Sequence, residues 1–309
     1  LIDRTDGNNL DEIKAAVKVL DDYDTYHPYA DVELMRYYFL TKEDANIEKA
    51  AKKADELYSE YPENPYISYY CGEAFEKHGQ KAAAEEIWNK LLADDPDHYM
   101  AKYGVAKLMA EREQYADAKE YCLDLLDIDD RSVELREFLD ELNVKLVEIY
   151  QAKLSENNDD FEVANKLAWC YFQQQKFKDV ETLLLQLDEK YHEEYDYINL
   201  IGRNYLAMDE YDKAMKYLPR WQEMLEETVD DGSKEATKRL NRRGFSYFAI
   251  GYCQWNQNLI PEATENLYKS FELEEKLPTK LSYMDQLALF YLDALLKALD
   301  FWISAISFR

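Results

Sequence analysis

The chain has 309 residues, of which 47% are hydrophobic, so it is long and apolar enough to bury a large core, which argues against a disordered chain. Its 8 Gly and 7 Pro are too few for the turns of a β-sandwich or an α/β sheet, and the composition predicts helices almost throughout. With 64 acidic and 37 basic residues, the formal net charge is -27, which argues against nucleic acid and anionic lipid as partners.

The first segment, residues 1–30, has the pattern of the second half of a helix pair. A polar turn at Gly7 leads into apolar Val17 and Leu20 at helical spacing, and Pro28 follows. We therefore predict a partial first repeat, and we expect either that its first helix lies upstream or that the chain is a fragment.

Three regular helix pairs are predicted over residues 31–132. In the second of them, small Gly72 and Ala84 stand where two helices would cross, and Trp88 follows Ala84 one turn later. Close packing of a helix pair needs this combination of small and large residues. Equivalent starts recur every 34 residues, at Asp31, Pro65, Tyr99 and Val133.

The unit that begins at Val133 departs from this period, because the next start, Phe161, comes only 28 residues later (161-133). Asp140 and Asn143 stand where the pattern has a small and an aromatic residue. We predict an irregular short unit over residues 133–160, formed by a longer helix pair.

Two further helix pairs are predicted over residues 161–228, with Ala168 and Gly202 at the crossing positions. The next interval grows to 49 residues (244-195), so residues 229–278 are predicted to form an extended repeat. For the added length we expect an extended second helix, kinked near Pro219, and a polar loop between Glu226 and Arg243.

A recurring turn supports the same periodicity. Each copy places an aromatic or aliphatic residue before an acidic or helix-initiating first turn, and a small or β-branched residue follows on the buried face. The copies lie at residues 46–50, 114–118, 176–180, 210–214 and 259–263.

The last segment, from Leu287 to Phe308, is strongly apolar and long enough to suggest a membrane span. A helix here would nevertheless have a polar stripe, formed by Asp293, Lys297 and Asp300. Charged residues near the middle of a membrane span cost roughly 2.5 to 3.5 kcal/mol each. We therefore predict a C-terminal capping helix over residues 279–309, whose apolar face covers the last repeat, a partner or a second copy.

These patterns resemble the tetratricopeptide repeat, a helix-turn-helix unit found in bacterial multi-repeat proteins. The clearest match is at Gly72, Phe75, Gly79, Ala84, Trp88 and Pro96. The resemblance implies an all-α fold for residues 1–309: a single right-handed α-α superhelical solenoid of about six to seven helix pairs, without a sheet. A looser resemblance is to the repeat region of proteins with a chaperone-type J domain, but the His-Pro-Asp tripeptide of that domain is absent, since Tyr29 follows His27 and Pro28.

The resemblance also implies a concave groove, lined by the first helix of each pair, as the binding surface for a peptide. Aromatic side chains there either form the floor of the groove or pack between repeats. Lys107 and Arg203 either bind a ligand carboxylate or pair with nearby acids. Some members of the family clamp a terminal carboxylate with Lys, Asn and Arg, but here that set is incomplete. The predicted groove residues are Tyr66, Tyr69, Tyr103, Lys107, Asn165, Trp169, Asn199, Arg203, Phe248 and Tyr252.

Protein binding without catalysis is the leading prediction: a scaffold or adaptor that holds a peptide or helical segment of another protein. The alternatives are a structural module that forms a homodimer through the C-terminal helix, and a co-chaperone-like repeat region. The acidic surface either serves solubility or attracts a basic partner. The one concentration of Lys and Arg lies at residues 238–243.

No catalytic residue, cofactor or metal ligand is predicted. The four His have no partner at metal or triad spacing, and the sequence has no Gly-rich phosphate loop. The four Cys are far apart and form no CxxC pair, so we expect buried free thiols in a reducing compartment and a cytoplasmic protein.

Overall fold

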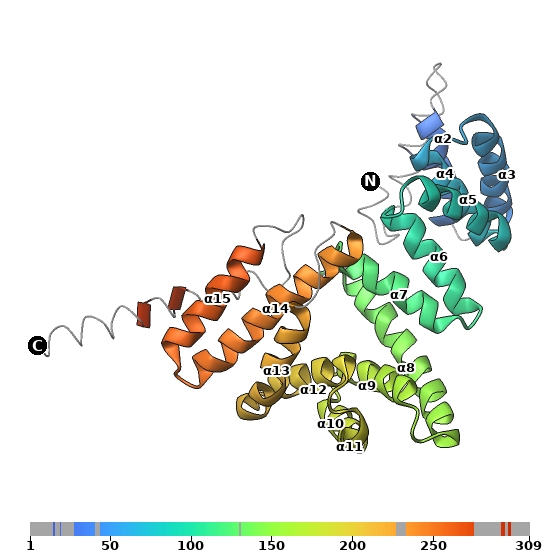
Figure 1. Cartoon of the computed structure of the whole chain (residues 1–309). Helices are drawn as coiled ribbons and strands as arrows, with labels where there is room; N and C mark the ends of the chain where they lie inside the picture. The colour runs from blue at the N-terminus through green and yellow to red at the C-terminus, as the bar shows by residue number, and fades with distance from the viewer. Residues whose placement is uncertain are drawn as a thin grey trace, which may run out of the picture. The chain divides into compact units, whose positions relative to one another are not determined.

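Helices make up all the regular structure of the described chain. The computed structural model describes residues 28–40, 44–129, 131–226 and 233–274, and the single positions 15, 19, 292, 293, 296 and 297. Within these ranges every regular element is an α-helix, which confirms the predicted all-α fold (Figure 1). In chain order the helices are α2 (Pro28–Leu40), α3 (Asp44–Glu60), α4 (Pro65–Lys77), α5 (Lys81–Asp94), α6 (Tyr99–Glu111), α7 (Tyr115–Leu126), α8 (Val133–Glu156), α9 (Phe161–Gln173), α10 (Phe177–Leu185), α11 (Asp188–Tyr191), α12 (Tyr195–Ala207), α13 (Tyr211–Glu226), α14 (Lys234–Asn256) and α15 (Ile260–Glu274).

The chain divides into two compact units, unit 1 (Leu1–Leu142) and unit 2 (Asn143–Arg309), and the division falls inside α8. Consecutive helices pack pairwise, in the manner of tetratricopeptide-like repeats. The pairs are α2 with α3, α4 with α5 and α6 with α7 in unit 1, and α9 with α10, α12 with α13 and α14 with α15 in unit 2. The sequence predicts one continuous solenoid over residues 1–309, and its superhelical shape stays a prediction.

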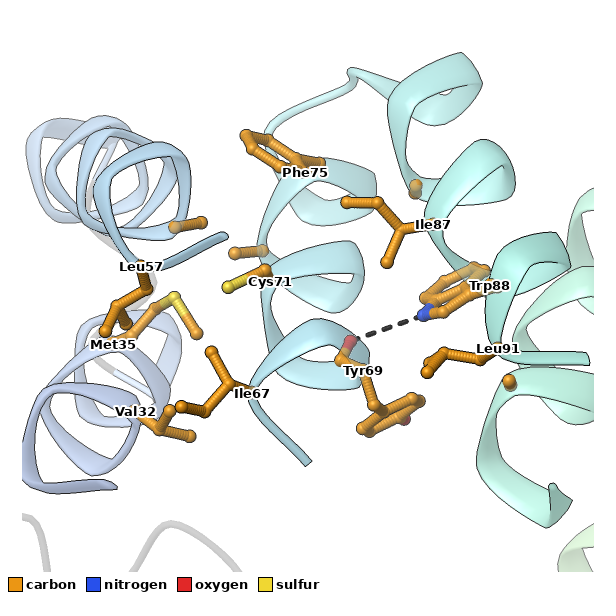
Figure 2. Packing of buried hydrophobic residues seen from close by; sticks show 14 of the residues in the cluster. Val32, Met35, Leu57, Ile67, Tyr69, Cys71, Phe75, Ile87, Trp88 and Leu91 are labelled. Atoms are coloured by element: carbon orange, nitrogen blue, oxygen red, sulfur yellow. Dashed lines mark hydrogen bonds between the residues drawn. The ribbon is translucent and has the colours of Figure 1, made fainter. Parts of the chain in front are cut away.

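The core of unit 1 is built around Trp88 of α5, of which only 3% is exposed. The indole lies against α4 and α6 at two glycines: a Cβ at Gly72 would lie 2.5 Å from Trp88 Nε1, and one at Gly104 would lie 2.7 Å from the ring. The indole N–H donates to the backbone carbonyl of Tyr69 at 3.3 Å (Figure 2). Since these approaches leave no room for a Cβ, the predicted crossing at Gly72 is confirmed.

The same crossing recurs in unit 2, with leucine in place of tryptophan. A Cβ at Gly202 of α12 would lie 3.1 Å from Leu218 Cδ2 of α13. Ala168 and Val180 are fully buried in the core of this unit. Small residues therefore bring the helices of a pair together in both units, as the sequence pattern predicts.

Five turns between the two helices of a pair contain one residue in the left-handed backbone conformation. In four of them this residue directly precedes a turn segment that was predicted from the sequence. The five residues are Gly79 (φ 86°), Glu113 (φ 62°), Gln175 (φ 58°), Asp209 (φ 59°) and Asn258 (φ 61°). Only the first is the glycine that this conformation favours.

We expect Gln175→Gly to raise the free energy of unfolding by about 0.5 to 1 kcal/mol, because glycine adopts a positive φ without the steric penalty of a Cβ. The matched control is Gln174→Gly: Gln174 has a φ of -80°, so glycine there relieves no strain and should lower stability. Chemical denaturation followed by circular dichroism measures both variants. A less stable Gln175→Gly would contradict the prediction.

The predicted helix pair at residues 133–160 is wrong, because the structure has one 24-residue helix there, α8. No Gly or Pro occurs between Val133 and Glu156, so nothing in the local sequence ends the helix. Near its middle, Asn143 is fully buried, and neither atom of its amide has a hydrogen-bond partner among the described residues.

The extended repeat also differs from its prediction. The polar loop expected between Glu226 and Arg243 is helical from Lys234 onward, so the added length lies largely in the first helix of the last pair, α14. Ser233 starts this helix, because its side chain accepts a hydrogen bond from the N–H of Ala236 at 3.0 Å. The preceding helix, α13, continues through Pro219.

The predicted partial repeat at residues 1–30 and the predicted capping helix at residues 279–309 lie largely outside the described residues. Within the second segment, Trp255 Nε1 donates to the Asp293 carboxylate at 2.7 Å, and Lys297 pairs with the same carboxylate at 2.8 Å. In the part of the chain that the structure describes, no helix is both long and apolar enough to cross a membrane.

Candidate functional site

Three neighbouring first helices of unit 2, namely α9, α12 and α14, carry stripes of side chains that meet at Arg203. On α12 the stripe is Tyr195, Asn199 and Arg203, which are spaced by four residues and therefore share one face of the helix. We call the whole surface the Arg203 face. Its members are Asn165, Trp169 and Phe172 of α9, Tyr195, Asn199 and Arg203 of α12, and Asn241, Arg242 and Phe245 of α14.

Aromatic rings from two helices surround the Arg203 guanidinium. Its central carbon lies 5.3 Å from the ring centre of Trp169, 5.8 Å from that of Phe172 and 4.8 Å from that of Phe245. All three distances are within the reach of a cation–π interaction. One cation of α12 thus links α9 on one side to α14 on the other.

Arg203 has no acidic partner in the part of the chain that the structure describes. No carboxylate of the described residues pairs with it, and its Nε has no acceptor among them. Burial and, to a smaller extent, the positive charge of Arg242 together lower the pKa of Arg203 to about 10. Arg112 of unit 1 shows the usual arrangement, since it donates to both oxygens of Glu85 at 2.8 and 2.5 Å. A protein with a large excess of acids therefore leaves this one partly buried cation uncompensated.

Polar atoms without a hydrogen-bond partner gather on the same face. A buried polar atom left in this state costs about 1 to 3 kcal/mol, so native structures hold few of them. Asn199 is only 7% exposed, and its Oδ1 accepts no hydrogen bond from the described residues. The full set on the Arg203 face is Asn165 Oδ1, Tyr195 OH, Asn199 Oδ1, Arg203 Nε and Asn241 Oδ1. Groups of this kind are suited to a ligand that supplies the missing partners.

The other two predicted groove residues of unit 2 continue along α14. Phe248 is 6% exposed and packs against Leu267 of α15. The ring of Tyr252 stacks on it at 6.0 Å between ring centres and also meets the ring of Tyr211 edge-on at 5.9 Å. Phe248 is therefore a core residue, whereas Tyr252 keeps part of its ring at the surface.

The tyrosines predicted for the groove in unit 1 differ from one another in exposure. Tyr66 is 41% exposed, and its hydroxyl donates to Glu33 at 2.9 Å. Tyr69 is 9% exposed and stacks on Trp88 at 6.2 Å between ring centres, so it belongs to the core. Tyr103 is partly buried. Tyr69 and Tyr103 thus have the same position in successive repeats but different environments.

The polar groups predicted in unit 1 have partners within that unit. Tyr103 donates to Glu134 at 2.7 Å, and burial together with this carboxylate raises the pKa of its hydroxyl. Lys107 lies 4.1 Å from the ring centre of Tyr103 and 3.8 Å from the Glu134 carboxylate. Unlike Arg203, these groups do not need a ligand to complete their contacts.

The ten predicted groove residues thus divide into a set in unit 1 and a set in unit 2. In unit 2 the structure brings Trp169 and Arg203 into direct contact. Five members of the Arg203 face are absent from the predicted groove residues, namely Phe172, Tyr195, Asn241, Arg242 and Phe245. The signal for Tyr195 and Phe172 was the helical spacing itself, since Tyr195 comes two turns before Arg203 and Phe172 comes one turn after Trp169.

Groups that hold metals or react as nucleophiles are sparse in the described residues. These residues contain no group of three or more His, Cys, Asp or Glu that is placed to hold a metal ion. All four cysteines are buried thiols, as predicted, and burial raises the pKa of Cys71 and Cys253 to about 12 and that of Cys122 to about 11. Thiols in this state are poor nucleophiles.

Helix pairs that pack in sequence, small residues at their crossings and one left-handed residue in the turn define the class as a tetratricopeptide-like helical-repeat protein. No protein-family model matches the chain, and no curated protein matches it. Its fold is similar to that of a tetratricopeptide repeat protein from Parabacteroides merdae ATCC 43184, at 14% identity and a TM-score of 0.31, over 92% of this chain and 91% of that one. Yeast Tom70 is similar at 15% identity and a TM-score of 0.31, over 93% of this chain and 73% of that one. The pilF protein of Pseudomonas aeruginosa is similar at 15% identity and a TM-score of 0.33, over 72% and 100%. At such values nothing about function follows from the likeness.

Proposed function

We propose that this protein is a non-enzymatic scaffold or adaptor that binds a peptide or helical segment of another protein on the Arg203 face. The observation that carries the proposal is a partly buried arginine that has no acidic partner among the described residues and lies in direct contact with rings from two neighbouring helices. Buried thiols agree with a protein of a reducing compartment, and we propose the cytoplasm as its location.

The chemistry of the Arg203 face matches that of a peptide. The unpartnered amide oxygens of Asn165 and Asn199 can accept hydrogen bonds from backbone N–H groups, and the Arg203 guanidinium can donate to a carbonyl or a carboxylate. Trp169 and Phe245 supply large, fairly rigid apolar area beside these groups. A peptide presents donors, acceptors and side chains within one short segment, so it can satisfy all three features together.

A selection from a displayed library of random peptides tests the proposal. We expect the unmodified protein to enrich a set of peptides, and we expect Trp169→Ala with Asn199→Ala to weaken their binding by about 2 kcal/mol or more. The matched control in unit 1, Tyr66→Ala with Tyr103→Ala, should bind them as the unmodified protein does. Circular dichroism checks that each variant keeps its helices.

Three outcomes would overturn the proposal. In the first, the selection enriches no peptide. In the second, the enriched peptides bind the Trp169→Ala, Asn199→Ala variant as tightly as they bind the unmodified protein. Loss of binding in the unit 1 control alone would move the binding surface to unit 1 and would also contradict the proposal.

A further inference from the structure

The one basic stretch of the sequence lies next to Arg203. Lys238, Asn241, Arg242 and Phe245 of α14 follow one another at offsets of three, four and seven residues and therefore share one face of the helix. Because the Phe245 ring contacts the Arg203 guanidinium, this face of α14 is turned toward Arg203. The first half of the stripe on α14 is thus basic, and the second half is aromatic.

The arginines of this stretch pair only at long range with acids of the described residues. Arg239 and Arg242 share a single carboxylate, that of Glu235, at 3.7 and 3.8 Å. Arg243 reaches Glu226 only at 3.8 Å, and the same carboxylate accepts a hydrogen bond from the Tyr247 hydroxyl. These distances exceed that of a normal hydrogen bond, and ion pairs between exposed side chains contribute little.

Cations of α12 and α14 lie near one another on this surface. Arg203 is partly buried and has no acidic partner among the described residues, and the positive charge of Arg242 acts on it unfavourably. The chain as a whole has 64 acidic residues, yet none of those described pairs with Arg203. Cations placed in this way would attract an anionic group.

We infer that the segment bound on the Arg203 face is acidic, with Asp or Glu side chains that reach Arg203 and Arg242 at the same time. This inference rests on the proposed function and names the chemistry of its partner. The net charge alone would favour a basic partner, so the inference reverses that expectation for this one surface. A carboxylate bound by a guanidinium forms two parallel hydrogen bonds, which would supply the acceptor that Arg203 lacks.

Two labelled peptides with amidated C-termini provide the test. In the first, Glu alternates with Tyr and Ser, and in the second every Glu is replaced by Gln. We expect fluorescence anisotropy to show at least about tenfold tighter binding of the Glu peptide, with an advantage that shrinks as salt is added. Since both C-termini are blocked, a difference between the peptides comes from side-chain carboxylates. A third peptide, with a free C-terminal carboxylate, serves as a comparison. If that peptide alone bound, the surface would recognise a terminal carboxylate, and the inference would be overturned.

Variants assign the effect to its residues. Arg203→Gln with Arg242→Gln should abolish the preference for the Glu peptide. Lys90→Gln with Arg112→Gln removes the same number of charges from exposed ion pairs of unit 1, with Glu63 and Glu85, and should keep the preference. Should the first double variant fail to fold, the salt dependence of the two peptides on the unmodified protein decides the question.

The failure of this inference differs from failure of the proposed function. Equal affinity for the Glu and Gln peptides would overturn the inference, while peptides enriched from the random library would still support the proposed function. A short single-stranded oligonucleotide that binds as tightly as the Glu peptide would overturn the assignment to an acidic peptide, because the surface would then recognise negative charge alone. Enrichment of no peptide in the library would overturn both.

Discussion

Replacing Trp88 by Ala should lower the free energy of unfolding by about 3 to 5 kcal/mol, the range seen when a large aromatic side chain is removed from a core. The indole is 3% exposed and fills the space between Gly72 and Gly104. Neither glycine has a side chain to move into the cavity. The variant also loses the hydrogen bond from the indole to the carbonyl of Tyr69. Chemical denaturation followed by far-ultraviolet circular dichroism measures the loss.

Two control variants test whether the loss of stability comes from the packing of Trp88 or would follow any substitution in unit 1. Gly104→Ala keeps the indole but adds a Cβ 2.7 Å from its ring, and such overpacking should cost about 1 to 3 kcal/mol. Tyr66→Ala removes an aromatic ring that is 41% exposed, and its cost should stay near 1 kcal/mol. A Trp88→Ala protein as stable as the Tyr66→Ala protein would contradict the packing described for unit 1.

The fold was predictable because its constraints are local and repeated. A small residue at Gly72, Ala168 or Gly202 is needed wherever two helices cross, so the same residue types return at a fixed interval. A positive φ in the turn adds a second periodic constraint, although only Gly79 has the residue that favours it. The small crossing residues and the recurring turn segments are therefore the two periodic signals that make the class of fold visible in a single sequence.

Departures from the period were less predictable. A helix pair was expected at residues 133–160 because the neighbouring units have one, whereas the local sequence contains no residue that would break α8. In the extended repeat, the start of α14 is marked in the sequence only by the N-cap residue Ser233. The charged residues around it are also compatible with a loop. At residues 133–160 the repeat pattern led to the wrong prediction, and in the extended repeat the charged composition did.

The candidate site was predictable only in part. The helical register predicts that Asn199 and Arg203 share one face, but it does not predict which basic side chains form ion pairs with an acidic residue. Lys107 meets Glu134 on a different helix, and no acid reaches Arg203 among the described residues. Such differences arise from tertiary contacts between residues far apart in the chain. The same holds for Tyr69, which is buried because it stacks on Trp88.

Arg203→Met should abolish the preference for an acidic peptide and at the same time make the protein more stable by about 1 kcal/mol. Methionine has a similar length and an apolar side chain, and it contacts aromatic rings favourably. The substitution removes a partly buried charge and an Nε without an acceptor, each of which costs free energy in the unbound protein. The cation–π contacts that are lost offset part of this gain, since they contribute about 0.5 to 2 kcal/mol.

Chemical denaturation compares the free energy of unfolding of the Arg203→Met variant with that of the Arg112→Met variant. Arg112 is exposed and bound to both oxygens of Glu85, so its replacement should leave stability unchanged or slightly lower. A destabilised Arg203→Met would instead mean that the guanidinium holds α9, α12 and α14 together and has a structural role. A more stable variant that no longer distinguishes the two peptides would mean that Arg203 is maintained at a cost in stability, which is expected of a residue whose partner is supplied by a ligand.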